Sequence, residues 1–105
     1  MDRLSMLDNI IRRRPDDPFP RYAQAIEFGK AGRDDEARGA FAYLAREHAE
    51  YLPAYLMSGT QLQKMGLLKD ASVALKAGVA VAKAASDEHT LGELEAALAD
   101  LESSE

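Results

Sequence analysis

The sequence contains no cysteine, and this absence excludes several kinds of site. The chain can form no disulfide, no thiolate nucleophile and no cysteine-ligated metal centre. It also lacks long apolar runs, since none approaches the ~18 residues of a membrane-spanning helix. The first residues have no apolar core of the kind that a signal peptide needs. The sequence therefore predicts a cytoplasmic protein.

Groups that could carry out catalysis or bind a metal are scarce as well. The two histidines, His48 and His89, lie far apart in the sequence, whereas a metal site needs several converging ligands. Ser58, Thr60 and Thr90 lack histidine and aspartate companions at a spacing suited to nucleophilic catalysis. No phosphate-binding GxxxxGK loop is present. We therefore expect no catalytic residues, no metal and no cofactor, and predict that the protein is not an enzyme.

A chain of 105 residues forms one small domain, which can bury roughly two-thirds of its unfolded surface. Its net charge of −5 is unevenly distributed. Up to Arg33 seven basic residues outnumber five acidic ones, whereas from Asp87 onward there are seven acidic residues and no lysine or arginine. Three adjacent arginines (12–14) are placed to complement the dipole at a helix C-terminus. Because the chain is acidic overall, we expect no nucleic-acid partner, and because it lacks a long apolar run, we expect no membrane partner.

One stretch of the sequence repeats at an offset of 34 residues. Residues 55–75 (YLMSGTQLQKMGLLKDASVAL) align at that offset with residues 21–41 (RYAQAIEFGKAGRDDEARGAF). Small residues meet small ones, and large apolar residues meet large ones. The aligned pairs are Ala25 and Gly59, Phe28 and Leu62, Gly32 and Gly66, Ala37 and Ala71, and Phe41 and Leu75. A period of this length is typical of stacked helical hairpins.

This spacing resembles the tetratricopeptide repeat (TPR). The small residue of the first helix, the glycine turn and the large apolar residue of the second helix match in both copies. The usual first-helix tryptophan is replaced by Arg21 in one copy and Tyr55 in the other. The resemblance implies an all-α fold, a right-handed stack of antiparallel helical hairpins. Two TPR units would be preceded by a half-repeat helix and followed by a capping helix.

Turn and capping signals divide this single domain, residues 1–105. Residues 16–18 (DDP) are a helix start signal, and Gly32 and Gly66 are each expected just after a helix end. Asp34 and Ser86 are expected to be the N-caps of the helices that follow them. The predicted parts are a half-repeat helix at 1–15, a first repeat at 18–49, a second repeat at 52–84 and a capping helix at 86–103.

Residue size predicts how the helices pack. Small residues are expected where paired helices approach closely, whereas Gly39 has no such explanation. The residues assigned to these crossings are Ala25, Ala37, Gly59, Ala71 and Gly78. On the last helix a leucine seam consists of Leu91, Leu94, Leu98 and Leu101.

The resemblance also implies a concave groove, lined by the first helices of successive hairpins, that often holds an extended peptide or a helix. A clamp of lysine, asparagine and arginine on a partner's terminal carboxylate is not expected. The corresponding positions hold Tyr22, Ile26 and Met57, which cannot make that charge-assisted contact. The expected groove residues are Phe19, Tyr22, Ile26, Lys30, Leu56, Met57, Thr60 and Gln63.

We therefore predict a non-catalytic interaction or scaffold module that binds a protein segment, a peptide or a helix, in an apolar groove. The alternative is a self-associating structural protein, in which the groove or the C-terminal leucine seam forms a homodimer. The C-terminal helix of the same chain could also cover the groove. The sequence does not name the partner.

Overall fold

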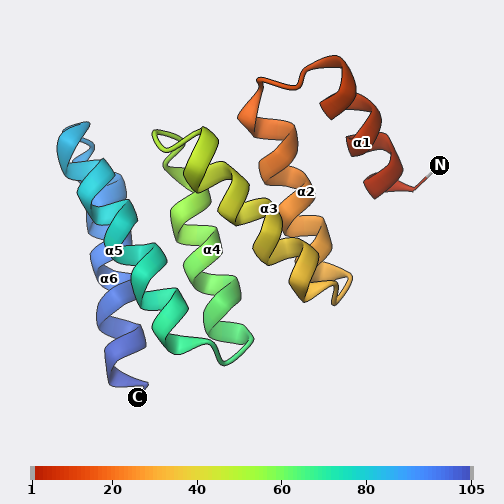
Figure 1. Ribbon diagram of the computed structural model, residues 1–105. Helices are drawn as coiled ribbons and strands as arrows, with labels where there is room; N and C mark the ends of the chain where they lie inside the picture. The colour runs from red at the N-terminus through yellow and green to blue at the C-terminus, as the bar shows by residue number, and fades with distance from the viewer. Residues whose placement is uncertain (1, 105) are drawn as a thin grey trace. The chain divides into compact units, whose positions relative to one another are not determined.

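The computed structural model describes residues 2–104, and all regular secondary structure in this range is α-helical (Figure 1). The all-α prediction is confirmed. The helices are α1 (Arg3–Arg13), α2 (Pro18–Lys30), α3 (Asp34–Glu47), α4 (Pro53–Lys64), α5 (Leu68–Ala84) and α6 (Glu88–Ser103). They form two compact units, one of α1 to α3 up to His48 and one of α4 to α6 from Ala49. Within residues 2–104 no helix has both the length and the apolar composition that crossing a membrane requires.

Proline and aspartate set the boundaries of the first two helices. The Asp17 carboxylate accepts a hydrogen bond from the Phe19 N–H at 3.1 Å, and Pro18 is the first residue of α2. α1 ends at Arg13, two residues before Pro15, because the residue that precedes a proline avoids the helical conformation. The predicted start signal of α2 is confirmed.

Three helices, α2, α4 and α5, end in the same kind of turn. After α2 and α4 the turn residue is a glycine with positive φ, Gly32 at 74° and Gly66 at 78°. After α5 Ser86 takes this place, with a φ of 56°. In each turn the next N–H donates to a carbonyl five residues earlier, as Asp87 does to Ala82 at 3.0 Å. The helix-ending role predicted for both glycines is confirmed.

Two of the predicted N-caps are wrong. The N-cap of α6 is Asp87 and not Ser86, and its carboxylate accepts a hydrogen bond from the Thr90 N–H at 3.0 Å. This bond lowers the pKa of Asp87. Asp34 is the first residue of α3, and the cap position before it holds Arg33, which makes no side-chain capping bond. Both predictions fail for the same reason, because the N-cap is the residue directly after the turn residue with positive φ. Asp87 follows Ser86, and Arg33 follows Gly32.

The residues predicted at close helix crossings are all buried, namely Ala25, Ala37, Gly59, Ala71 and Gly78. A β-carbon added to Gly59 would lie 2.5 Å from the Cγ atom of Leu75, and one added to Gly78 would lie 2.6 Å from the Cβ atom of Tyr55. Neither position has room for a side chain. A β-carbon at Gly39 would meet nothing within 4 Å, so packing does not explain this glycine.

All three helices of the second unit contribute to its core. α6 packs against both α4 and α5. Leu94 and Leu101 of the leucine seam are fully buried, whereas Leu91 and Leu98 are half-buried at the edge of the core. The buried half of the seam therefore belongs to the interior of its own unit.

The two residues at the tryptophan position of the repeat make equivalent hydrogen bonds. The Tyr55 hydroxyl donates to the Ala49 carbonyl at 2.6 Å. In the first unit the Arg21 Nε–H donates to the Pro15 carbonyl at 3.3 Å. Pro15 and Ala49 are themselves related by the 34-residue offset. Different side chains thus tie the first helix of each hairpin to the segment before it.

Candidate protein-binding surface

In the first unit, α1 packs against one face of α2 (Figure 1), and polar side chains contribute to this contact. The Gln24 amide donates to the Asp8 carboxylate at 2.6 Å, and the Arg3 guanidinium pairs with Glu27 at 2.8 Å. Leu7 of α1 is buried. This face of α2 is therefore used for packing within the unit.

A second face of α2 packs against α3. Ala25 is fully buried there, as is Ala37 on α3. At the edge of this contact, the guanidinium of Arg21 lies 4.2 Å from the centre of the Tyr43 ring, a distance suited to a cation–π interaction. Two of the three faces of α2 are thus occupied by helices of the same unit.

The groove residues predicted on α2 lie on its third face. Phe19, Tyr22, Ile26 and Lys30 follow one another at intervals of three or four residues, so they share one side of the helix. Phe19 is 60% exposed. Tyr22 and Ile26 are half-buried, and burial raises the pKa of the Tyr22 phenol. This face therefore presents an aromatic ring next to a partly covered apolar surface.

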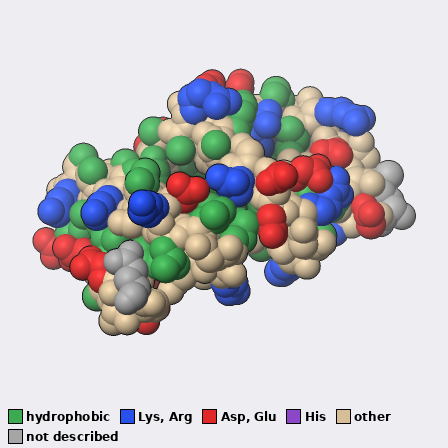
Figure 2. Space-filling model, turned by 60° about the horizontal axis from the view of Figure 1, so that its bottom comes forward, with side chains coloured by type: hydrophobic (Ala, Val, Ile, Leu, Met, Phe, Trp, Pro, Cys, Tyr) green, Lys and Arg blue, Asp and Glu red, His purple; other side chains and the backbone are tan. Residues whose placement is uncertain are grey.

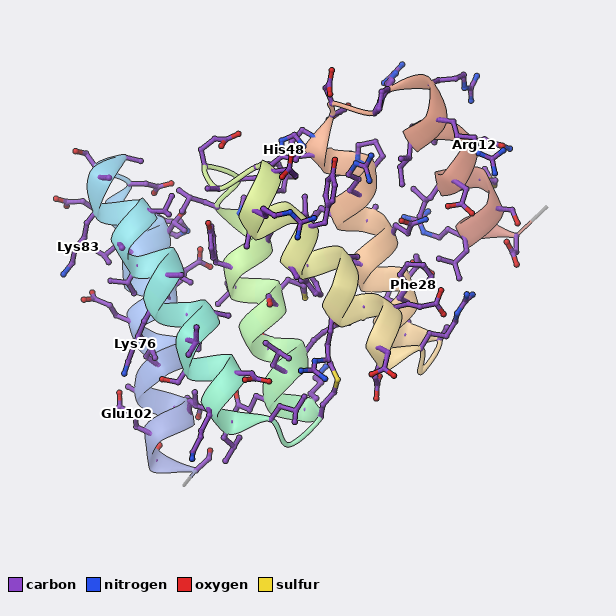
Figure 3. All side chains as sticks on the ribbon, viewed as in Figure 1. Arg12, Phe28, His48, Lys76, Lys83 and Glu102 are labelled. Carbon is purple, nitrogen blue, oxygen red and sulfur yellow. The ribbon has the colours of Figure 1, made fainter. Side chains whose placement is uncertain are left out.

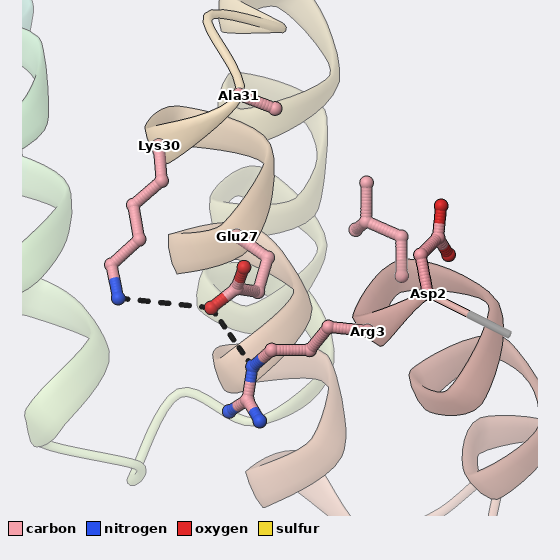
Figure 4. A pocket seen from close by; sticks show the side chains of 6 residues that line it. Asp2, Arg3, Glu27, Lys30 and Ala31 are labelled. Carbon is pink, nitrogen blue, oxygen red and sulfur yellow. Dashed lines mark hydrogen bonds and ion pairs between the residues drawn. The ribbon is translucent and has the colours of Figure 1, made fainter.

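Lys30 lies at the C-terminal end of this face, beside a shallow hollow between α1 and α2 (Figure 4). The carboxylate of Glu27 pairs there with Arg3 at 2.8 Å and with the Lys30 ammonium at 3.7 Å. The hollow, of about 290 Å³, is lined by Asp2, Arg3, Leu4, Glu27, Lys30 and Ala31. Two acidic and two basic side chains balance its charge. Residues 2–104 contain no group of three or more histidine, cysteine, aspartate or glutamate side chains that could hold a metal ion.

The groove residues predicted on α4 belong to the second unit, and all four, Leu56, Met57, Thr60 and Gln63, are half-buried. Leu56 packs against the core of this unit, so part of its side chain is used for stability. The Thr60 hydroxyl donates to the Leu56 carbonyl at 2.9 Å, within the same helix. Among the four residues, Met57 is therefore the large apolar side chain outside that core.

Sequence reasoning missed two exposed apolar side chains. Met6 on α1 is 51% exposed and Val73 on α5 is 69% exposed. Helical spacing could have identified Val73, because it lies on the opposite side of α5 from the buried residues Ala71 and Leu75. Val73 is far in the sequence from the third face of α2, which we call the α2 face, and it belongs to the second unit. It is therefore a suitable control position for experiments on the α2 face.

The helical arrangement is shared with solved structures from Salinibacter ruber. The solution NMR structure of a tetratricopeptide repeat domain protein from this organism matches with a TM-score of 0.81 and 30% sequence identity. The match covers 87% of this chain and 92% of that chain. A crystal structure of a tetratricopeptide repeat domain protein from the same organism matches with a TM-score of 0.76 and 29% identity, over 85% of this chain and 100% of that chain. No protein-family model and no curated protein sequence matches the chain.

Proposed function

The chain belongs to the tetratricopeptide repeat family, and from this premise we propose that it is a non-catalytic module that binds a protein segment on the exposed face of α2. Helical repeat proteins of this kind generally present extended surfaces to protein partners. The observation that carries the proposal is Phe19, an aromatic side chain that is 60% exposed on a helix face which neither α1 nor α3 occupies.

We further propose that the hairpins α2–α3 and α4–α5 are the two repeat units, with α1 as the half-repeat helix and α6 as the cap. Two observations support this division. Gly32 and Gly66 form equivalent turns. Arg21 and Tyr55 make equivalent hydrogen bonds. The cytoplasmic location indicated by the sequence stays a prediction.

The chemistry of the α2 face favours a partner segment with an apolar anchor. Aromatic side chains are enriched in protein interfaces, where they bury a large area with little loss of conformational freedom. Phe19 and Ile26 can contact such an anchor, and Tyr22 adds a phenol beside it. In the second unit, the 34-residue offset relates Leu56 to Tyr22 and Thr60 to Ile26. The partner is therefore an apolar or amphipathic protein segment.

Photo-cross-linking in cells tests this proposal. A photoreactive phenylalanine analogue replaces Phe19 in one variant and Val73, which is 69% exposed on α5, in the control variant. We expect the variant labelled at position 19 to form an adduct of defined mass with another protein, and the variant labelled at position 73 to lack that adduct. An adduct with a second copy of this chain would support the homodimer instead. Equal adducts from both positions, or none from position 19, would contradict a binding site at α2.

A further inference from the structure

The α5–α6 hairpin carries two rows of opposite charge. Lysines recur every seven residues along α5, and glutamates recur every seven residues along α6. The rows are Lys69, Lys76 and Lys83 on α5, and Glu88, Glu95 and Glu102 on α6. Seven residues are close to two helical turns, so each row lies along one edge of its helix. All six side chains are exposed, and the ion pairs found within residues 2–104 involve none of them.

The two rows run side by side at matching levels. The short turn that joins α5 to α6 makes the two helices antiparallel. Gly78 and Leu94 lie at one level of this pair, because a β-carbon on Gly78 would be 3.1 Å from the Cδ2 atom of Leu94. We count residues from that level along both helices, in opposite sequence directions. Each lysine of α5 then lies within about one residue of the level of a glutamate of α6. The matched positions are Lys83 and Glu88, Lys76 and Glu95, and Lys69 and Glu102.

Both rows lie on the side of the hairpin that faces away from α4. Figure 3 shows Lys76 and Lys83 of α5 and Glu102 of α6 on this side, with α4 on the other. In Figure 2 a line of basic side chains lies beside acidic ones at the left end, where α5 and α6 are located. The opposite charges therefore share one surface of the second unit.

Half-buried apolar side chains lie between the two rows. By helical spacing, Leu68 and Val79 lie between the buried side of α5 and its lysine row. Leu91 and Leu98 occupy the same place between the buried side of α6 and its glutamate row. All four pack against the core of the unit and keep part of their surface exposed. We call the lysine row, this apolar strip and the glutamate row together the charged edge.

We propose that a second copy of this chain docks on the charged edge, with the lysine row of each copy opposite the glutamate row of the other. A two-fold axis parallel to the helices produces this pairing. It places the lysine row of one copy opposite the glutamate row of the other, and it leaves each residue at the same level along the helices. Each contact then occurs twice, as in any isologous interface. Exposed ion pairs are individually weak, so the rows select the orientation and the apolar strip supplies the affinity. This surface is separate from the α2 face, so either proposal can fail without the other.

Charge reversal and mixing test the proposal. The first variant carries Lys69→Glu, Lys76→Glu and Lys83→Glu, and the second carries Glu88→Lys, Glu95→Lys and Glu102→Lys. Each variant alone has two rows of the same sign, so we expect its self-association to weaken by about a hundredfold relative to wild type. An equimolar mixture should associate again, because all facing rows are then of opposite sign. Sedimentation equilibrium over a dilution series measures the mass of each sample.

Pairing of the same lysines and glutamates within one chain predicts a different result. The mixture would then stay monomeric, because neither variant could supply its partner with a missing intramolecular contact. That result would overturn the proposal, as would a wild type that is monomeric over the whole series. Circular dichroism checks that the variants fold. If a triple variant does not fold, the single changes Lys76→Glu and Glu95→Lys at the central level allow the same mixing test, with restored association expected again.

Discussion

Replacing Leu94 by alanine is expected to destabilise the second unit by about 2–5 kcal/mol. Leu94 is fully buried, and its side chain lies against Gly78 of α5. The substitution removes this apolar contact and leaves a cavity that the surrounding helices can fill only in part. Urea unfolding followed by circular dichroism measures the change in the free energy of unfolding.

The matched control is Leu91→Ala, which removes the same side chain from a half-buried position on the same helix. We expect a clearly smaller loss, because part of the Leu91 side chain is already in contact with water. A Leu94→Ala variant that loses less than about 1 kcal/mol would show that α6 is not an integral part of this core.

Replacing Gly78 by alanine is expected to destabilise the protein by about 1–3 kcal/mol through overpacking. The added methyl group would meet the Cβ atom of Tyr55 at 2.6 Å, and this atom is fixed to the α4 backbone. The two helices must therefore move apart. The intrinsic preference of alanine for helices, up to about 1 kcal/mol over glycine, offsets only part of this cost.

Gly92→Ala is the matched control for Gly78→Ala, because it makes the same change on α6 where a β-carbon would meet nothing within 4 Å. It is expected to stabilise the protein by up to about 1 kcal/mol. The two changes should thus shift the midpoint of thermal unfolding in opposite directions. Shifts of the same sign would contradict the close approach of α4 and α5 at Gly78.

The repeat period located the turns and the close helix crossings because each of them requires a small residue at a fixed position of the repeat. A backbone with positive φ favours glycine, and a close helix crossing excludes a large side chain, so Gly66 and Ala71 were visible in the sequence. The N-cap of α6 was not, since Ser86 and Asp87 are both good capping residues. The hydrogen bonds of the preceding turn decide between them, and they assign Ser86 to the turn.

The candidate site was predictable only in part. Helical spacing alone placed Phe19 and Ile26 on the same face of α2. The same spacing grouped Leu56 with the groove, but packing against the core of the second unit depends on how α4, α5 and α6 come together. Helical spacing also could not distinguish Leu94, which is buried, from Leu98, which is half-buried at the charged edge. Tertiary contacts, which no local pattern encodes, decided both cases.

The affinity of the cross-linked partner for two serine variants tests most directly whether the α2 face is the binding site. Phe19→Ser and Val73→Ser each remove one large apolar side chain from the surface, at 60% and 69% exposure. Both should leave the free energy of unfolding within about 0.5 kcal/mol of wild type. Phe19→Ser is expected to weaken binding by at least about tenfold, as loss of an aromatic interface anchor does, and Val73→Ser is expected to leave it unchanged. Equal affinities for the wild type and both variants would contradict a binding site on α2.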